Sequence, residues 1–275
     1  MTRTALACGW QAIRRWPILT LIIYGVGVAM AFLIAIPFAV AIQDAAGSSK
    51  GLLAGSFELG LWYDTFREAR GDLFTVALHL LWVVPLYLVW DAASSVGLCF
   101  ALANGHGFWH GAGRFAGRSV VIGLVYLAML IAVLAGLIAM IEAMGLLIAP
   151  GAVRFYLQAV GIPVGLVLAV LLINLMRDAS RAALVVQDVG LGRALRAGLA
   201  AWPMTGAYVL WTAAALGILA VSIALESSLN AGTMGSAVIL AVGLQVLMLL
   251  RAAVRVAWHG SLVALTPLPS LPAGG

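Results

Sequence analysis

Residues 16–43 read WPILTLIIYGVGVAMAFLIAIPFAVAIQ and contain no charged side chain. A helix needs about 20 apolar residues to cross the hydrocarbon core of a bilayer. Five further charge-free runs follow, at 73–90, 119–141, 155–176, 197–225 and 227–250. We therefore predict an all-α polytopic transmembrane bundle of six helices, with amphipathic helices at the interface.

The composition leaves little room for anything outside the membrane. Hydrophobic residues make up 64% of the chain and charged residues 9%, whereas soluble domains carry about 25% charged residues. We predict one integral membrane domain over 1–275. Its expected spans are 16–42, 73–90, 119–143, 155–176, 203–226 and 237–264.

The start of the chain is basic and is followed by an apolar run over 17–42. The hydrophobic region of a cleaved signal is roughly 7–15 residues long, so this longer run predicts an uncleaved first helix. The two cysteines, Cys8 and Cys99, are too few for a disulfide framework.

The distribution of arginines predicts the orientation. If the N-terminus is cytoplasmic, most arginines fall in inner segments, and five of the acids gather in the first outer segment, 43–72. Lys and Arg in short loops favour the cytoplasmic side. We expect both termini to be cytoplasmic and the protein to lie in a bacterial inner membrane.

Two stretches fit the six-span scheme less simply. Residues 92–113 are also uncharged and could extend the second span, re-enter the membrane or lie at the interface. The Gly- and His-rich end of this stretch, 104–113, favours a turn. On the outer side, apolar residues among polar ones over 52–70 predict an amphipathic helix on the membrane surface.

The fourth span is followed by DASRAALVVQD at 178–188 and GRALRAGL at 192–199. This segment resembles uncharacterised bacterial six-helix membrane proteins that look related to the membrane domain accompanying some glycerophosphodiester phosphodiesterases. In that group a helix leaves the membrane through an Asp-x-x-Arg step, reaches a second acid and continues into a basic amphipathic helix. The resemblance implies a membrane scaffold or transport-like domain. It does not imply enzymatic activity, because no phosphodiesterase catalytic domain is present.

Charged residues predict one cluster on the inner side. Asn174, Asp178, Arg181 and Asp188 follow one helical stripe, and Arg251, Arg255 and His259 follow another. We expect Arg251 to be buried and to pair with Asp178 or Asp91, because a charge in hydrocarbon is costly unless it has a partner. Arg255 should point toward the inner interface. The predicted cluster is Asp91, Asp178, Arg181, Arg251 and Arg255.

This cluster has two interpretations. It could line a substrate or ion pathway that opens to the cytoplasm. Alternatively, it could be an ion pair that holds the fourth and sixth spans together, with Arg255 reaching lipid headgroups. The second interpretation is the more common role of such residues, and we favour it.

The histidines suggest cofactors only weakly. His79 and His259 are expected at opposite leaflets, which argues against a haem held between them. His79, near Trp82 and Tyr87, is a candidate ligand for a chlorophyll-type pigment, although a lone membrane histidine more often hydrogen-bonds another helix. His106 and His110 could bind a metal only if their segment is helical. We predict no metal, no catalytic residues and no bound cofactor other than lipid.

Three functions remain after these exclusions. The favoured one is a non-enzymatic subunit or scaffold of a larger membrane complex, with membrane lipids and other membrane subunits as partners and no nucleic acid. The alternatives are a small transporter or channel, and a pigment-bearing subunit of an electron-transfer or light-harvesting assembly.

Overall fold

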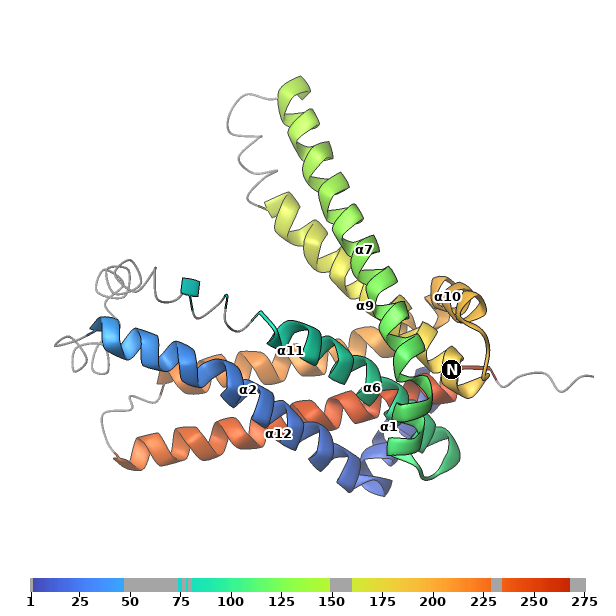
Figure 1. Ribbon diagram of the computed structural model, residues 1–275, viewed down its shortest axis with the longest axis horizontal. Helices are drawn as coiled ribbons and strands as arrows, with labels where there is room; N and C mark the ends of the chain where they lie inside the picture. The colour runs from blue at the N-terminus through green and yellow to red at the C-terminus, as the bar shows by residue number, and fades with distance from the viewer. Residues whose placement is uncertain are drawn as a thin grey trace, which may run out of the picture. The chain divides into compact units, whose positions relative to one another are not determined.

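The computed structural model describes residues 2–46, 74–75, 78, 81–148, 160–228 and 234–267, and the elements in these ranges are all helical (Figure 1). The prediction of an all-α bundle is confirmed. The elements in chain order are α1 (Thr2–Arg15), α2 (Pro17–Ala46), α6 (Val83–Asn104), α7 (Phe108–Ile148), α9 (Ile162–Val186), α10 (Leu191–Leu199), the 3₁₀ turn η3 (Trp202–Met204), α11 (Thr205–Ser228) and α12 (Met234–Leu265).

Six of these helices are long and apolar enough to cross a membrane. The qualifying segments are Pro17–Pro37, Pro85–Asn104, Phe108–Met140, Ile162–Val186, Trp202–Leu225 and Val238–Leu265. By length and composition the chain is a multi-pass membrane protein.

The second and third spans differ from their predicted limits. α6 continues to Asn104, past the predicted end of the second span at residue 90, and α7 begins at Phe108 instead of 119, whereas the predicted start at residue 73 lies outside the described residues. Residues 92–104 are therefore a continuation of the second helix. The expected turn over 104–113 is confined to 105–107, where Gly105 and Gly107 both have a φ of +80°, in the left-handed region that glycine adopts without strain.

Gly111 and Gly113 both lie within α7, and for Gly111 close packing against α6 explains why a glycine stands there. A Cβ on Gly111 would collide with the ring and Cβ of Phe100, so the absent side chain lets α6 and α7 approach closely after the turn. Reading these glycines as turn signals was wrong, because here a glycine serves packing within a helix.

The fourth span continues well past its predicted end at residue 176. α9 runs to Val186, so Arg177, Asp178 and Arg181 all lie within a single helix that is long enough to span the membrane. Asp188 lies beyond the helix with a φ of +46°, so it does not share the stripe of Asp178 and Arg181 as predicted.

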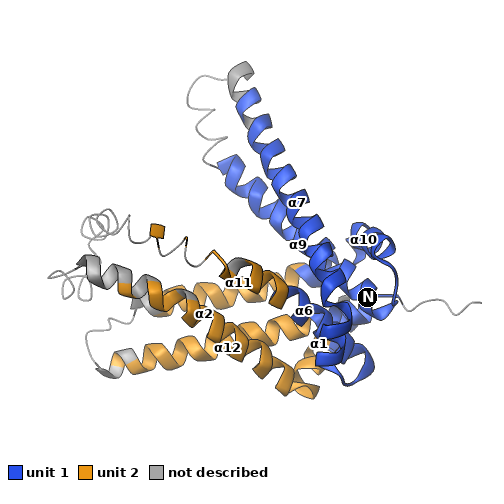
Figure 2. Ribbon diagram, viewed as in Figure 1, with its two compact units in different colours: residues 1–8, 91–208, 259–275 blue, residues 9–90, 209–258 orange. Residues whose placement is uncertain are grey.

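The chain divides into two compact units (Figure 2). Unit 1 comprises 1–8, 91–208 and 259–275, and unit 2 comprises 9–90 and 209–258. In unit 1, α9 packs along α7 and α10 packs against both. Its core contains fully buried apolar side chains: Val96, Leu98, Cys99, Phe115, Ile122, Leu184 and Leu262.

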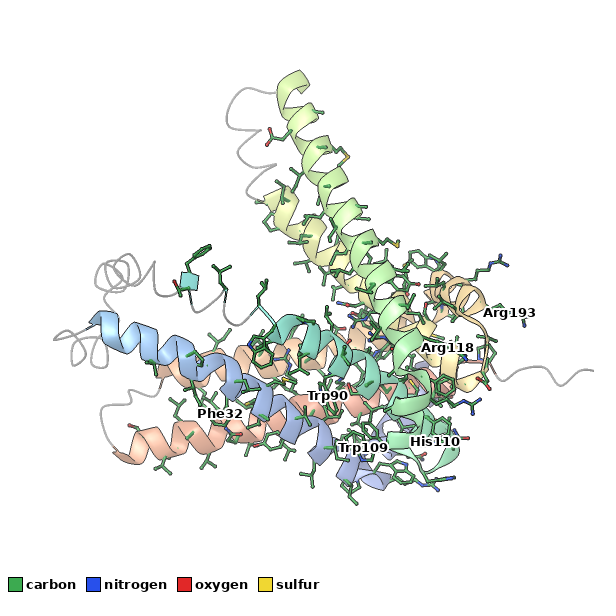
Figure 3. The ribbon with its side chains drawn as sticks, viewed as in Figure 1. Phe32, Trp90, Trp109, His110, Arg118 and Arg193 are labelled. Carbon is green, nitrogen blue, oxygen red and sulfur yellow. The ribbon has the colours of Figure 1, made fainter. Side chains whose placement is uncertain are left out.

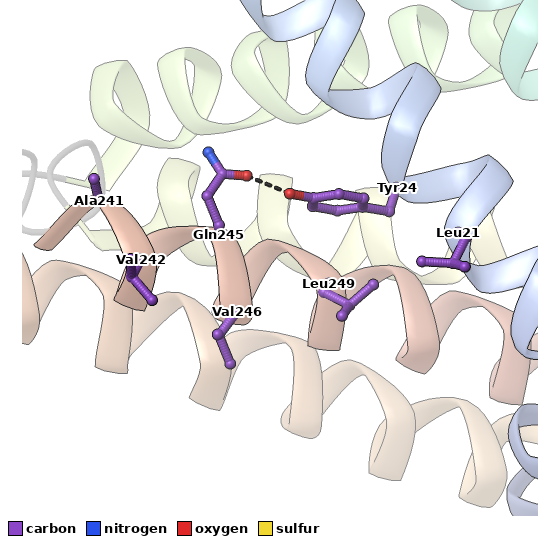
Figure 4. Close-up of a pocket in the computed structure, with 7 residues that line it drawn as sticks. All are labelled: Leu21, Tyr24, Ala241, Val242, Gln245, Val246 and Leu249. Atoms are coloured by element: carbon purple, nitrogen blue, oxygen red, sulfur yellow. Dashed lines mark hydrogen bonds between the residues drawn. The ribbon is translucent and has the colours of Figure 1, made fainter. Parts of the chain in front are cut away.

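Unit 2 contains α2, most of α11 and most of α12. Many large apolar side chains on these helices are exposed, including Phe32, Leu216, Ile223 and Ile239. Exposed apolar surface is what a helix facing lipid requires. Within this unit Tyr24 of α2 hydrogen-bonds the side chain of Gln245 of α12, beside a shallow apolar groove of about 350 Å³ (Figure 4).

Two further predictions fall outside the described residues. These are the outer amphipathic helix at 52–70 and the proposed pigment ligand His79.

Candidate functional site

A cluster of four charged side chains lies in the core of unit 1, between α6 and α9. Nη1 of Arg181 donates a hydrogen bond of 2.8 Å to Oδ2 of Asp91 and lies 3.8 Å from Oδ1 of Asp178. Asp178 and Arg181 are three residues apart on α9, so one helical turn places both on the same face. Asp91 comes from α6, so the pairing with Arg181 joins the two helices.

Arg177 completes the cluster. Its Nε lies 3.3 Å from Oδ1 of Asp178, and its Nη1 lies 3.8 Å from Oδ2 of Asp91. Two arginines and two aspartates make the cluster electrically neutral, and each carboxylate contacts both guanidinium groups. Because the charges compensate one another, the cluster can exist within a membrane-spanning segment at a tolerable cost.

The cluster is well shielded. The Arg181 side chain is 2% exposed, the two aspartates 11–12%, and Arg177 26%. Arg181 also donates a hydrogen bond of 3.3 Å to Oγ of Ser95, one turn after Asp91 on α6. Arg177 is therefore the charged group of the cluster that the surroundings reach most easily.

A glycine on α7 makes room for the Arg181 guanidinium. A Cβ on Gly123 would lie 3.3 Å from Nη2 of Arg181, which is tighter than ordinary van der Waals contact. Nearby, the hydroxyl of Ser119 on α7 donates a hydrogen bond of 3.0 Å to the carbonyl of Ala92, next to Asp91. The backbone of α6 is thus fixed to α7 beside the charged cluster.

On α9, one turn from Arg177, a second polar group connects α7 with α10. The hydroxyls of Tyr126 and Ser180 lie 2.9 Å apart, and Ser180 also donates a hydrogen bond of 2.9 Å to the carbonyl of Met176. Gly198 of α10 lies directly over this group, since a Cβ there would collide with Tyr126 Oη, Ser180 Oγ and the Met176 carbonyl. Close approach of this kind requires glycine.

The end of α12 also contributes to unit 1. His259 is 3% exposed and interacts electrostatically with Asp178. Ser261 donates a hydrogen bond of 2.8 Å to the carbonyl of Ala5 on α1, so the first and last helices meet in this unit.

Three of the five predicted cluster residues meet, namely Asp91, Asp178 and Arg181. The predicted burial of Arg251 is wrong: its side chain is exposed, and the aspartates expected beside it contact Arg177 and Arg181 instead. Arg255 is half-buried. Arg251 and Arg255 belong to unit 2, and the other three residues to unit 1.

Arg177 was missing from the predicted cluster. Because the fourth span is predicted to end at 176, Arg177 counts in the sequence as one of the arginines of an inner segment. The sequence held one signal for it: Arg177 and Arg181 are four residues apart and flank Asp178, which is the spacing of an ion network on one helical face.

The remaining polar candidates do not form a metal site. His106 lies in the turn with its Nδ1 3.0 Å from the Asn104 carbonyl oxygen, to which an Nδ1–H donates, while the His110 ring packs against Phe100. Within the described ranges no three His, Cys, Asp or Glu side chains converge as metal ligands would. Asp188 forms an ion pair of 2.7 Å with Arg114, on the surface of unit 1.

Chemically, the cluster can stabilise the packing of α6, α7 and α9, or it can bind and release an anion at its most exposed member, Arg177. No protein-family model, curated protein or solved structure matches the chain.

Proposed function

We propose that the chain is a non-enzymatic integral membrane subunit or scaffold of a larger membrane complex. The observation that carries this proposal is the exposure of Arg251 on an apolar, span-length segment of α12. Arg251 is 13 positions after Val238, the first residue of that segment, or roughly 20 Å along the helix at 1.5 Å per residue. A hydrocarbon core is about 30 Å thick, so the Arg251 side chain leaves the helix at a depth inside the core.

A charge at that depth needs an anionic partner, since its insertion costs about 2.5–3.5 kcal/mol on translocon scales. Arg251 forms no ion pair with a described side chain, and the described side chains of unit 2 include no carboxylate. Three carboxylates of unit 1, Asp91, Asp178 and Asp188, already pair with arginines of their own unit. A carboxylate from another subunit would supply the missing charge.

The buried cluster supports the same proposal. Its four charges compensate one another, as expected of a group that stabilises the packing of a scaffold. The resemblance of residues 178–199 to a scaffold-like or transport-like membrane domain implies a role of the same kind.

The test is the native mass of the protein after gentle extraction from its own membrane. We expect a mass above that of the 28.6 kDa chain, and we expect Arg251→Gln to release the partner. Arg14→Gln is the matched control, because Arg14 is an exposed arginine outside the span-length segments. A lone chain in both the native protein and the variants would refute the proposal.

A small transporter or channel is the second candidate, favoured by the presence of four ionisable groups inside span-length helices. Such groups often mark ion or substrate pathways. Arg177, the most exposed of the four, is the residue to change. Proteoliposomes that conduct ions or take up solute, and lose this activity in Arg177→Gln, would support the transporter over the scaffold.

The third candidate, a pigment-bearing subunit, can be distinguished from the other two by one absorption spectrum. The absorption spectrum of the purified protein would show a visible band if His79 or another residue held a chlorophyll-type pigment. A featureless visible spectrum would remove this alternative.

A further inference from the structure

The short helix α10 is amphipathic and attached to unit 1 by one face. Ala194 and Gly198 are buried against the helices beneath, whereas Arg193, Arg196 and Leu199 are exposed. Arg193 and Arg196 are three residues apart, so both lie on the outward side of the helix.

A second pair of arginines lies on the neighbouring helix α7. Arg114 and Arg118 are one turn apart and both exposed. Arg114 forms the ion pair with Asp188, just before α10, which fixes the start of α7 next to α10. We call Arg118, Arg193 and Arg196 the arginine face; Arg118 and Arg193 are labelled in Figure 3. Among the described residues, no carboxylate pairs with these three side chains.

The chain holds the arginine face at the membrane surface. α9, which is long enough to span, ends at Val186, and the next span-length segment begins at Trp202. Only residues 187–201 lie between them, and α10 occupies nine of these. A nine-residue helix is about 14 Å long, so α10 has too little chain on either side to leave the interface.

Apolar side chains adjoin the basic ones. Leu199 is 52% exposed and Trp202 is 66% exposed, and they follow Arg196 at intervals of three residues. A basic side with Leu and Trp beside it is the pattern of helices that lie in the headgroup region of a membrane. Tryptophan is also enriched at this depth.

We propose that the arginine face binds the phosphate groups of anionic phospholipids. The guanidinium groups of Arg193 and Arg196 bind headgroup phosphates, with Arg118 contributing from α7, while Leu199 and Trp202 contact the upper acyl chains. Arginine suits this task because its planar donors match phosphate oxygens in pairs. This inference is independent of the proposed role as a subunit.

The test compares lipid binding by the detergent-solubilised full chain and its variants, using native mass spectrometry with phosphatidylglycerol or phosphatidylcholine. We expect the native chain to prefer phosphatidylglycerol. Each arginine near a surface contributes about 1 kcal/mol, so Arg193→Gln with Arg196→Gln should weaken phosphatidylglycerol binding by about tenfold or more. Arg193→Lys with Arg196→Lys should retain most of the binding, because it keeps both charges.

The control is Arg3→Gln with Arg15→Gln, which removes two exposed arginines of α1 and the same net charge. It should change the affinity by less than threefold. An equal loss in the control and the α10 variant would overturn the proposal, because net charge alone would explain it. The proposal would also be overturned if the native chain showed no preference for phosphatidylglycerol. The same holds if the chain lacks this preference but binds an acidic protein in a way that depends on Arg193 and Arg196.

Discussion

Arg181 is the residue on which the polar core of unit 1 depends. Its guanidinium contacts Asp91, Asp178 and Ser95, and only 2% of the side chain is exposed. The pairing makes a sharp prediction, because removing one member of a buried ion pair leaves the other charge without compensation.

We expect Arg181→Met and Asp91→Asn each to lower the free energy of unfolding by about 3–5 kcal/mol. The double variant should cost about 0.5–3 kcal/mol less than the sum of the two, since it restores neutrality to the cluster. Denaturant unfolding in micelles measures this difference. Arg118→Met, at an exposed arginine of α7, should change little. Strictly additive single effects would show that the two groups are not coupled.

Prediction from the sequence was least accurate for the contacts of individual charged residues. Asp91, Asp178 and Arg181 could be grouped because acids and bases at similar depth seek each other in a membrane. The rotation of α12 could not be predicted in the same way. The stripe of Arg251, Arg255 and His259 indicated one buried face, but in the structure only His259 is buried, while Arg255 is half-buried and Arg251 is exposed.

The close packing of α10 onto unit 1 depends on one glycine. A Cβ on Gly198 would collide with atoms of Tyr126, Ser180 and Met176, and all three atoms belong to one hydrogen-bonded group. We predict that Gly198→Ala displaces α10 and destabilises the protein by about 1–3 kcal/mol, as overpacking does.

Gly192→Ala is the matched control in the same helix, because nothing lies within 4 Å of a Cβ there. It should be neutral or stabilise by up to about 1 kcal/mol through helix propensity. Unfolding measurements on both variants decide the matter. Equal effects at the two positions would contradict the packing at Gly198.

In the turn between α6 and α7, glycine is needed for its backbone conformation instead of for close packing. Gly105 has a φ of +80° with nothing within 4 Å of a Cβ, so Gly105→Ala should cost about 1–2 kcal/mol from backbone conformation alone. Gly113→Ala, a helical position with equally open surroundings, should not be destabilising. A thermal shift assay compares them, and a Gly105→Ala variant as stable as the native protein would refute the left-handed turn.

The sequence predicted which segments form helices, but it did not predict the residues at which some of these helices begin and end. Charge-free runs indicate spans because charges are excluded from hydrocarbon. They fail at helix ends that carry paired charges inside the protein. α9 continues through Arg177, Asp178 and Arg181 because these charges compensate one another, which a scan for uncharged residues cannot detect.

For the whole molecule, the sidedness of the loops remains a prediction from the arginine distribution. Cysteines introduced at His106 and Gly192, in a background without Cys8 and Cys99, should react with a membrane-impermeant reagent from the same side. The Arg114–Asp188 ion pair places these two segments at one end of unit 1. We expect that side to be the cytoplasm. Labelling of the two positions from opposite sides would contradict this topology.

The central claim is that Arg251 meets a carboxylate of another membrane subunit. The most direct test places a photo-crosslinking amino acid at position 251 and irradiates the protein in its own membrane. We predict a crosslinked product heavier than the chain by the mass of a second polypeptide, with no such product from the same probe at position 14. Adducts with lipid alone at position 251 would contradict the claim.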